Sequence, residues 1–258
     1  MAFPKRVPDG QKPFESKKLH AFVATPAYDG KVNTEYAQSL AETFRDCALT
    51  GIQTTACVMG NGAFIDLARN IFARLFLETE CTHLFFIDAD LKWESRAFIS
   101  LMTAGLPVCA GAYPKRQTPE EYPMRFVLGE NGKGLEMRGD WIMCDRVATG
   151  FLCIERSVIE KMSERAPKII DKNPNKPQPP TARLFHTYMD EEGRFVGEDF
   201  AWSKDYCEQF NDYIWCYPDF TFTHNKDFTG NWHNFLIRDA QRIMAEEEAK
   251  KAATHVEA

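Results

Sequence analysis

The sequence predicts an α/β fold in which a mostly parallel central sheet is flanked by helices. Throughout the first half of the chain, apolar segments of strand length alternate with segments whose apolar residues recur at helical spacing. Residues 83–87, His-Leu-Phe-Phe-Ile, form an apolar run that is typical of a central parallel strand buried on both faces. The resulting β-α-β-α-β-α-β order favours parallel strands joined by crossover helices.

Each element of the first half has its own signal. The first helix begins at Asn33 or Thr34, which are suitable N-cap residues, and ends at Gly51. The next helix has a strong apolar face, and the strand after it is followed directly by two acids. The strands are expected at 21–24, 54–59, 83–87 and 107–112, and the helices between them at 33–49, 63–78 and 94–105.

The second half has a different character. Short strands and Gly-rich turns are expected over 122–156, and the Pro-rich segment 167–182 is long and irregular, either disordered or a functional loop that closes as a lid. Helices at 157–164 and 199–211, a strand from 214 to 217 and a helical tail after 233 complete the chain. We expect a polar arm at 1–18, one domain at 19–236 and a helical tail at 237–258.

Composition and charge exclude several classes of protein. A chain of 258 residues is long enough to bury most of its apolar surface without a metal or disulfide, and a hydrophobic content of 44% is ordinary for a globular protein. The net charge of −6 argues against nonspecific electrostatic binding of nucleic acid by the whole protein, although the first twenty residues are basic. No apolar run has the length of a membrane span or of a secretory signal. The eight cysteines include no CxxC pair, which indicates thiols in a reducing, cytoplasmic compartment.

Absent motifs narrow the chemistry further. The chain has no GxxxxGK[ST] loop and no GxGxxG fingerprint, so a P-loop NTPase and a Rossmann dinucleotide site are disfavoured. It also has no GxSxG elbow and no HExxH motif.

The sharpest signal is the pair Asp88 and Asp90, which follows the apolar strand at 83–87. Residues i and i+2 of a strand face the same way, so both carboxylates are expected at the carboxyl edge of the sheet, where open α/β folds bind ligands. Paired carboxylates suit Mg²⁺ or Mn²⁺ that holds a diphosphate. The alternative explanation is a solvated turn, because a bare DxD is common by chance.

Other candidate residues have ordinary structural explanations as well. Asp66, Arg69 and Asn70 share one helical face, and an Asp–Arg pair on a helix surface is the simpler explanation for them. Glu198 and Asp199 open a helix, where the helix dipole favours acids, but either one could serve as a general base.

Three more side chains are candidates at the ends of later strands. His224 follows the last predicted strand and could complete a metal site begun by Asp90, which would favour Mn²⁺. Lys115 and Arg116 follow the fourth strand and could face a diphosphate, or could be solvated loop charges.

Taken in order, these segments resemble those of the GT-A glycosyltransferases, most closely the small family-2-like enzymes of viruses and phages. The resemblance covers roughly residues 19–236. The segments that carry it are Thr-Pro-Ala-Tyr-Asp at 25–29, Ala-Arg-Asn at 68–70, Phe-Phe-Ile-Asp-Ala-Asp at 85–90, Gly-Glu-Asp-Phe at 197–200 and Thr-His-Asn at 223–225. The chain departs from many family-2 enzymes because it lacks a Gln-x-x-Arg-Trp motif and membrane helices, which disfavours a processive polysaccharide synthase.

The resemblance implies a GT-A fold, with a nucleotide-sugar-binding half at 19–118 and an acceptor half at 119–236. It implies a nucleotide-sugar donor, a UDP-sugar first, with Mn²⁺ or Mg²⁺ held by Asp88, Asp90 and His224. Asp199, or less readily Glu198, matches the base of inverting members, and Thr149-Gly150-Phe151 matches an acceptor-side strand. The residues that match donor-binding positions, with Lys115 added as a cation near the diphosphate, are Thr25, Pro26, Tyr28, Asp29, Asp66, Arg69, Asp88 and Lys115.

The acceptor and the reaction class stay open at this point. A glycan or a hydroxymethylated DNA base would fit the acceptor side, and a phage- or virus-encoded enzyme would act in the host cytoplasm. A nucleotidyltransferase that makes a nucleotide sugar also uses a similar sheet with acidic metal ligands, but residues 25–30 are not Gly-rich as its loop would be. A non-catalytic nucleotide- or sugar-binding module is the third alternative.

Overall fold

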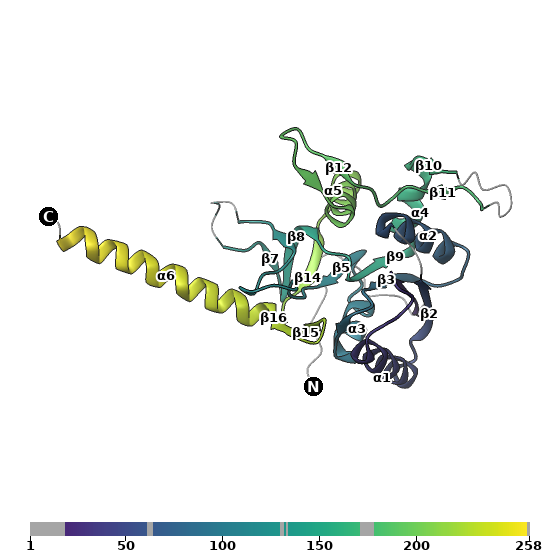
Figure 1. Ribbon diagram of the computed structural model, residues 1–258, viewed down its shortest axis with the longest axis horizontal. Coiled ribbons are helices and arrows are strands. Elements are labelled where there is room, and N and C mark those ends of the chain that lie inside the picture. Colours follow the sequence, from purple (N-terminus) through teal and green to yellow (C-terminus); the bar gives the residue numbers. More distant parts are fainter. Residues whose placement is uncertain (1–18, 61–63, 130–131, 133, 171–177, 257–258) are drawn as a thin grey trace.

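A computed structural model describes residues 19–60, 64–129, 132, 134–170 and 178–256. It contains a central nine-stranded sheet in the order β2-β1-β3-β9-β5-β14-β8-β6, with β7 also paired to β8 (Figure 1). Helices pack on both faces of this sheet, so the predicted α/β class is confirmed. The predicted arm at 1–18 and the centre of the predicted lid, 171–177, lie outside the described residues.

The bounds of the elements follow the sequence patterns closely. The sheet strands are β1 (His20–Ala27), β2 (Gln53–Gly60), β3 (His83–Ile87), β5 (Val108–Gly111), β6 (Met124–Phe126), β7 (Met137–Arg138), β8 (Trp141–Val147), β9 (Phe151–Glu155) and β14 (Ile214–Tyr217). The helices are α1 (Thr34–Thr50), α2 (Ile65–Leu77), α3 (Ser95–Met102), α4 (Arg156–Arg165), α5 (Glu198–Phe210) and α6 (Trp232–Val256).

Small pairings complete the structure. The strands β4 (Leu91–Lys92), β15 (Thr221–His224) and β16 (Phe228–Asn231) form a three-stranded sheet, and two-stranded pairs join β10 (Lys168–Ile169) to β11 (Thr181–Ala182) and β12 (Tyr188–Met189) to β13 (Phe195–Val196). The pair β10–β11 lies at the two ends of the predicted lid. Helix α6 begins at Trp232, so it spans the expected boundary at 236 and extends away from the sheet (Figure 1).

The sheet is mostly parallel in its first half, with two antiparallel insertions from the second. β1 runs parallel to β2 and β3, and β14 runs parallel to β5. β9 is antiparallel to both β3 and β5, and β8 is antiparallel to β14, β6 and β7. The simple β-α-β order did not indicate that a strand from the second half of the chain, β9, separates β3 from β5.

Two apolar layers hold the helices against the sheet. Leu84 and Phe86 of β3 belong to the layer under α2, α4 and α5, while Phe85 and Ile87 belong to the layer under α1 and α3. All residues of β3 are buried, as expected of a strand covered on both faces. Gly51 ends α1 in the left-handed region, with φ of 79°, where glycine has no Cβ penalty.

Buried His83 at the start of β3 makes the fold sensitive to acid. Its side chain is 3% exposed, and burial lowers its pKa from 6.5 to about 4. The folded pKa is depressed, so His83 contributes stability above pH 6.5 that is lost as the pH falls toward 4. We expect this residue to account for roughly 1–3 kcal/mol of the acid destabilisation in that window. Urea unfolding of the wild type and His83→Asn from pH 7 to pH 4 tests this. An equal change in the free energy of unfolding with pH in the two proteins would contradict it.

None of the helices in the described part of the chain is long and apolar enough to cross a membrane.

Candidate functional site

A cavity of about 500 Å³ opens where β1 and β3 end. Its walls come from the loop after β1, the start of α2, the loop after β3, and the turn after β15. Its lining residues are Pro26, Tyr28, Asp29, Lys31, Asn33, Ile65, Arg69, Asp88, Ala89, Asp90, Arg116 and Asn225. This is the carboxyl edge of the sheet, where the sequence places the candidate donor site.

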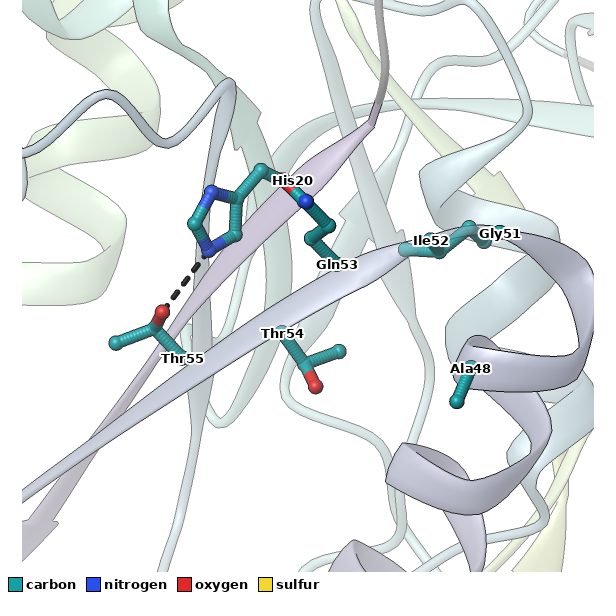
Figure 2. Close-up of a pocket in the computed structure, with 7 residues that line it drawn as sticks. All are labelled: His20, Ala48, Gly51, Ile52, Gln53, Thr54 and Thr55. Atoms are coloured by element: carbon teal, nitrogen blue, oxygen red, sulfur yellow. Dashed lines mark hydrogen bonds between the residues drawn. The ribbon is translucent and has the colours of Figure 1, made fainter.

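A larger groove of about 690 Å³ lies at the opposite ends of β1 and β2 (Figure 2). The titratable side chain among its described lining residues is His20, whose Nε2 lies 2.9 Å from Thr55 Oγ1. None of the described residues that line this groove carries a carboxylate. The smaller cavity, which gathers acids and bases, is therefore the candidate site.

The loop that carries Asp88 and Asp90 is fixed by backbone hydrogen bonds from three directions. Asp88 N–H donates to the Gly150 carbonyl (3.0 Å), Asn33 N–H donates to Ala89 (2.9 Å), and Asn225 N–H donates to Asp90 (2.9 Å). These bonds hold the loops after β1, β8 and β15 around the end of β3. The site is thus built from segments far apart in the sequence.

Asp88 and Asp90 both line the cavity, although β3 ends at Ile87 and the chain turns beyond it, with Leu91 N–H donating to the Asp88 carbonyl (3.2 Å). Asp88 Oδ1 lies 3.3 Å from Arg69 Nη2, whereas Asp90 Oδ2 lies 2.6 Å from Arg116 Nη2. The structure therefore gives each acid its own cation.

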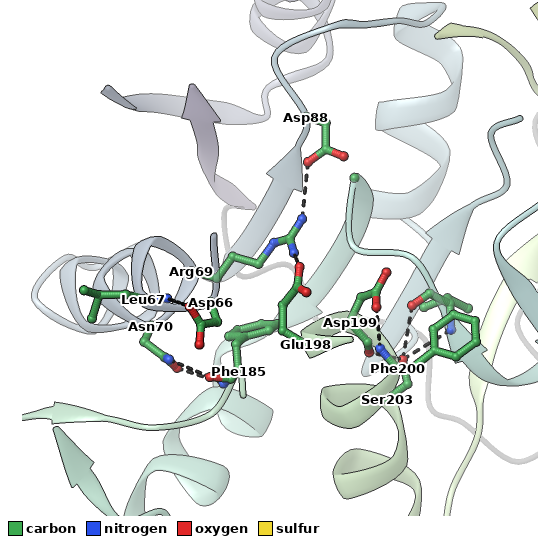
Figure 3. Close-up of polar contacts among 12 residues, drawn as sticks. Asp66, Leu67, Arg69, Asn70, Asp88, Phe185, Glu198, Asp199, Phe200 and Ser203 are labelled. Atoms are coloured by element: carbon green, nitrogen blue, oxygen red, sulfur yellow. Dashed lines mark hydrogen bonds and ion pairs between the residues drawn. The ribbon is translucent and has the colours of Figure 1, made fainter. Parts of the chain in front are cut away.

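Arg69 is the centre of a buried charge cluster. Its guanidinium pairs with Asp88 and with Glu198, and its side chain is only 6% exposed (Figure 3). The expectation of a plain surface pair on α2 is wrong, because this face of α2 packs against the end of β3 and the start of α5. Asn70, next to it, binds the backbone of Leu184 and Phe185 and fixes the segment that leads to α5.

Tyr113 was not identified from the sequence, yet it holds Asp88 from the other side. Its hydroxyl lies 3.4 Å from Asp88 Oδ2 and accepts a hydrogen bond from Gly150 N–H (3.0 Å). Burial raises the pKa of Tyr113, so the hydroxyl stays protonated and can donate to the carboxylate. A Cβ at Gly150 would collide with both groups, so glycine is required there. The available signal was the position of Tyr113, just beyond the carboxyl end of β5.

His224 reaches Asp90 through the pairing of β15 with β4, whose register places His224 opposite Leu91. Its Nδ1 lies 2.8 Å from the Pro114 carbonyl, which can only accept, so Nδ1 carries the proton. Its Nε2 then presents a lone pair to Arg116 Nε (2.8 Å) and lies 3.5 Å from Asp90 Oδ1. This backbone contact is the kind that fixes the tautomer of a metal-binding histidine.

Asp90 and His224 offer a carboxylate oxygen and an imidazole nitrogen, the donor types that suit Mn²⁺. Burial alone would raise the pKa of Asp90, but its polar neighbours, among them the guanidinium of Arg116, hold that pKa below its ordinary value, so the carboxyl stays ionised. Asp88 lines the same cavity, but its carboxylate is paired with Arg69 and lies beside the hydroxyl of Tyr113. In the described part of the chain, no group of three or more His, Cys, Asp or Glu side chains is placed to hold one metal ion.

Asp199 and Glu198 open α5 at the far side of the Arg69 cluster (Figure 3). Glu198 forms an ion pair with Arg69, while the Asp199 carboxylate accepts a hydrogen bond from the N–H of Phe200 (2.8 Å). Burial and the charge of Glu198 raise the pKa of Asp199, and Arg69 opposes them only in part. A buried carboxylate with a raised pKa is a stronger base than an exposed one.

Three predicted donor residues lie outside the cavity lining. Thr25 is fully buried and bonds to the hydroxyl of Tyr36. Asp66 lies in the first turn of α2, where its Oδ1 accepts the N–H of Leu67 (2.8 Å). Lys115 pairs with Glu121 instead of facing the cavity.

Pro26, Tyr28 and Asp29 do line the cavity, and Tyr28 is 78% exposed, which leaves its ring free to contact a ligand. Lys31, Asn33, Asn225 and, at the start of α2, Ile65 also line it and were not identified as site residues from the sequence. The three polar residues lie in loops, which carry no periodic signal.

No protein-family model matches the chain, and no curated protein matches it. Among solved structures it is similar to GalNAc-T7 crystallised with UDP, GalNAc and Mn²⁺, at 12% identity and a TM-score of 0.44, over 87% of this chain and 48% of that one. It is also similar to an inositol-1-phosphate CTP transferase from T. maritima, at 8% identity and a TM-score of 0.40, over 81% of this chain and 89% of that one.

A third similar structure is a mannose-1-phosphate geranyltransferase from Thermus thermophilus, at 13% identity and a TM-score of 0.38, over 58% of this chain and 61% of that one. The chain thus spans about half the length of GalNAc-T7 and about three fifths of the Thermus protein. At such identities and TM-scores, the function has to be argued from the residues of the site.

Proposed function

We propose that this chain is a metal-dependent glycosyltransferase that moves a sugar from a nucleotide-sugar donor, a UDP-sugar first, to an acceptor hydroxyl. The observation that carries the proposal is the close approach of two possible metal donors, His224 Nε2 and Asp90 Oδ1 (3.5 Å), beside a cavity that is lined by Asp90, Asp88 and the loop after β1. A donor diphosphate needs cationic neutralisation and its nucleoside needs a contact surface. The cations Lys31 and Arg116 and the exposed ring of Tyr28, which all line this cavity, support the proposal.

In this proposal each group of cavity residues binds a different part of the donor. Pro26, Tyr28 and Asp29 contact the nucleoside, and Asp90 and His224 would hold Mn²⁺ or Mg²⁺. When bound, the cation neutralises the charge that develops on the departing diphosphate. Asp88, held by Arg69 and Tyr113, orients the donor from the other side of the cavity.

Asp199 is the proposed general base. The acceptor enters on the α5 side, and Asp199 takes the proton from its hydroxyl as the new glycosidic oxygen forms. We propose inversion at the anomeric carbon, which follows if Asp199 acts in this way, and an acceptor hydroxyl on a glycan or a hydroxymethylated DNA base. Glu198 keeps Arg69 in place and is not the base in this arrangement.

A thermal-shift experiment tests the donor site. UDP, GDP, TDP and CMP are each added with and without Mn²⁺ to the wild type and to Asp90→Asn. A ligand at 100 times its Kd stabilises the fold by about 2.7 kcal/mol, or roughly 5–10 °C for a domain of this size. We expect one nucleotide to shift the wild type only with Mn²⁺, and Asp90→Asn to lose that shift.

The matched control is Asp239→Asn, which removes a carboxylate on α6 that pairs with Arg242. It should keep the full shift. The absence of any nucleotide-dependent shift in the wild type would contradict the proposal. The reaction products separate the remaining alternatives, because a glycosyltransferase releases a nucleoside diphosphate, a nucleotidyltransferase releases pyrophosphate, and a binding module releases neither.

A further inference from the structure

Arg116 lies across the two side chains that would hold the metal. Its Nη2 is 2.6 Å from Asp90 Oδ2, and its Nε donates to His224 Nε2 at 2.8 Å. One guanidinium thus contacts both donor groups of the proposed metal site. A cation bound there would need the His224 Nε2 lone pair that Arg116 uses, and beside Asp90 its charge would repel the guanidinium, so the guanidinium and the metal compete for this place.

The surroundings allow the guanidinium to leave while its ligands stay. The side chains of Asp90 and His224 are 16% and 9% exposed, whereas that of Arg116 is 54% exposed. His224 remains tied to the Pro114 carbonyl, and the Asp90 backbone remains tied to Asn225. Movement of Arg116 therefore requires only rotation of one long, half-exposed side chain.

We propose that Arg116 is an internal counter-cation that covers the metal-binding atoms of Asp90 and His224 and turns onto the donor diphosphate when a metal ion takes its place. This inference rests on the proposed function. Arg116 lines the same cavity as Pro26, Tyr28 and Asp88, so a diphosphate bound there lies within reach of its side chain. A planar guanidinium binds phosphate oxygens through two parallel hydrogen bonds. Contacts with water alone would not give the displaced guanidinium an equivalent partner.

A thermodynamic coupling follows from this exchange. Without a nucleotide, a metal ion displaces Arg116 from Asp90 and His224, and the guanidinium finds no new anionic partner. The metal ion alone therefore binds weakly. With a nucleoside diphosphate present, Arg116 gains a new partner as it leaves the old one, so each ligand strengthens the other by the same factor. Arg116 thereby acts as a positioning residue that favours joint loading of metal and donor.

The test measures Mn²⁺ affinity directly, by the loss of the free-Mn²⁺ electron paramagnetic resonance signal, with and without UDP. The proteins are the full-chain wild type, Arg116→Gln, Arg116→Lys and the matched control Lys115→Gln, which removes an equal charge one residue away that pairs with Glu121. Thermal melts establish that each variant is folded, and Asp90→Asn reports binding at other sites.

We expect Arg116→Gln to bind Mn²⁺ alone about tenfold more tightly than the wild type, and UDP to strengthen Mn²⁺ binding at least about tenfold more in the wild type than in this variant. Lys115→Gln should match the wild type. Arg116→Lys, which lacks the fork that spans two ligands, should fall between them. If Arg116→Gln were unfolded, a tighter Mn²⁺ affinity of Arg116→Lys would still carry the proposal.

Equal Mn²⁺ affinities in the wild type and the folded Arg116 variants would overturn this inference and leave the proposed function intact, provided that Asp90→Asn binds less. An equal gain in Lys115→Gln would also overturn it, because the effect would then be one of general charge. Failure of every variant to bind Mn²⁺, even with UDP, would overturn both this inference and the proposed metal site.

Discussion

Replacing Asp199 by asparagine is expected to remove sugar transfer and at the same time to raise the melting temperature. The loss of a general base costs about 10²–10⁴ in kcat. The gain in stability comes from the raised pKa of Asp199, which burial and Glu198 cause. A carboxyl with a raised folded pKa stabilises the protein at low pH and loses that contribution as the pH rises through its folded pKa, so at pH 7 the ionised group is destabilising. Asparagine removes this destabilisation.

The matched control is Asp205→Asn on the same helix. Burial also raises the pKa of Asp205, but this residue lies beside His186 and lines a different cavity. The control variant should keep its activity. Steady-state turnover and thermal melts measure both effects, and for the wild type the acid limb of kcat/KM should lie above the ordinary range of an aspartate. An active Asp199→Asn variant would contradict the assignment of the base.

Replacing Arg69 by glutamine is expected to have the largest effect on stability. The variant would leave Asp88, Glu198 and the nearby Asp199 in a buried cluster without their shared cation. Breaking a buried ion pair from one side costs about 3–5 kcal/mol, because an uncompensated charge remains in a poorly solvated place. Urea unfolding at pH 7 measures the loss.

Two further variants make that result specific. The double variant Arg69→Gln, Glu198→Gln removes one of the stranded charges and should recover part of the loss. Arg45→Gln removes a pair with Asp46 in which Arg45 is 65% exposed, so it should cost far less stability than Arg69→Gln. Equal losses in the free energy of unfolding for Arg45→Gln and Arg69→Gln would contradict the prediction, because burial of the Arg69 cluster would then add nothing to its stabilising effect.

The first half of the fold could be predicted from the sequence because its signals are local. The apolar run of β3 occurs within the expected limits of 83–87, and Gly51 ends α1 as expected. The site was predicted only in part, because its contacts depend on non-local pairing. The two-residue strand β4 carries no periodicity, yet its register with β15 brings His224 to Asp90.

The partners of the two acids could not be assigned for the same reason. The sequence places Lys115 and Arg116 side by side after β5, but the structure turns Arg116 to Asp90 and Lys115 to Glu121. Tyr113 reaches Asp88 only because β9 is inserted between β3 and β5, so that Gly150 lies between them. No pattern within β5 encodes that insertion.

The late position of β9 in the chain has a consequence for synthesis. β3 and β5 are made early, but the strand that pairs with both is completed only at residue 155, and β14 follows at 214–217. Until then the nascent chain has to keep the edges of β3 and β5 from pairing with other chains. We therefore expect slow folding that depends on contacts between residues far apart in the sequence, in which the sheet closes between β3 and β5 only after β9 has left the ribosome.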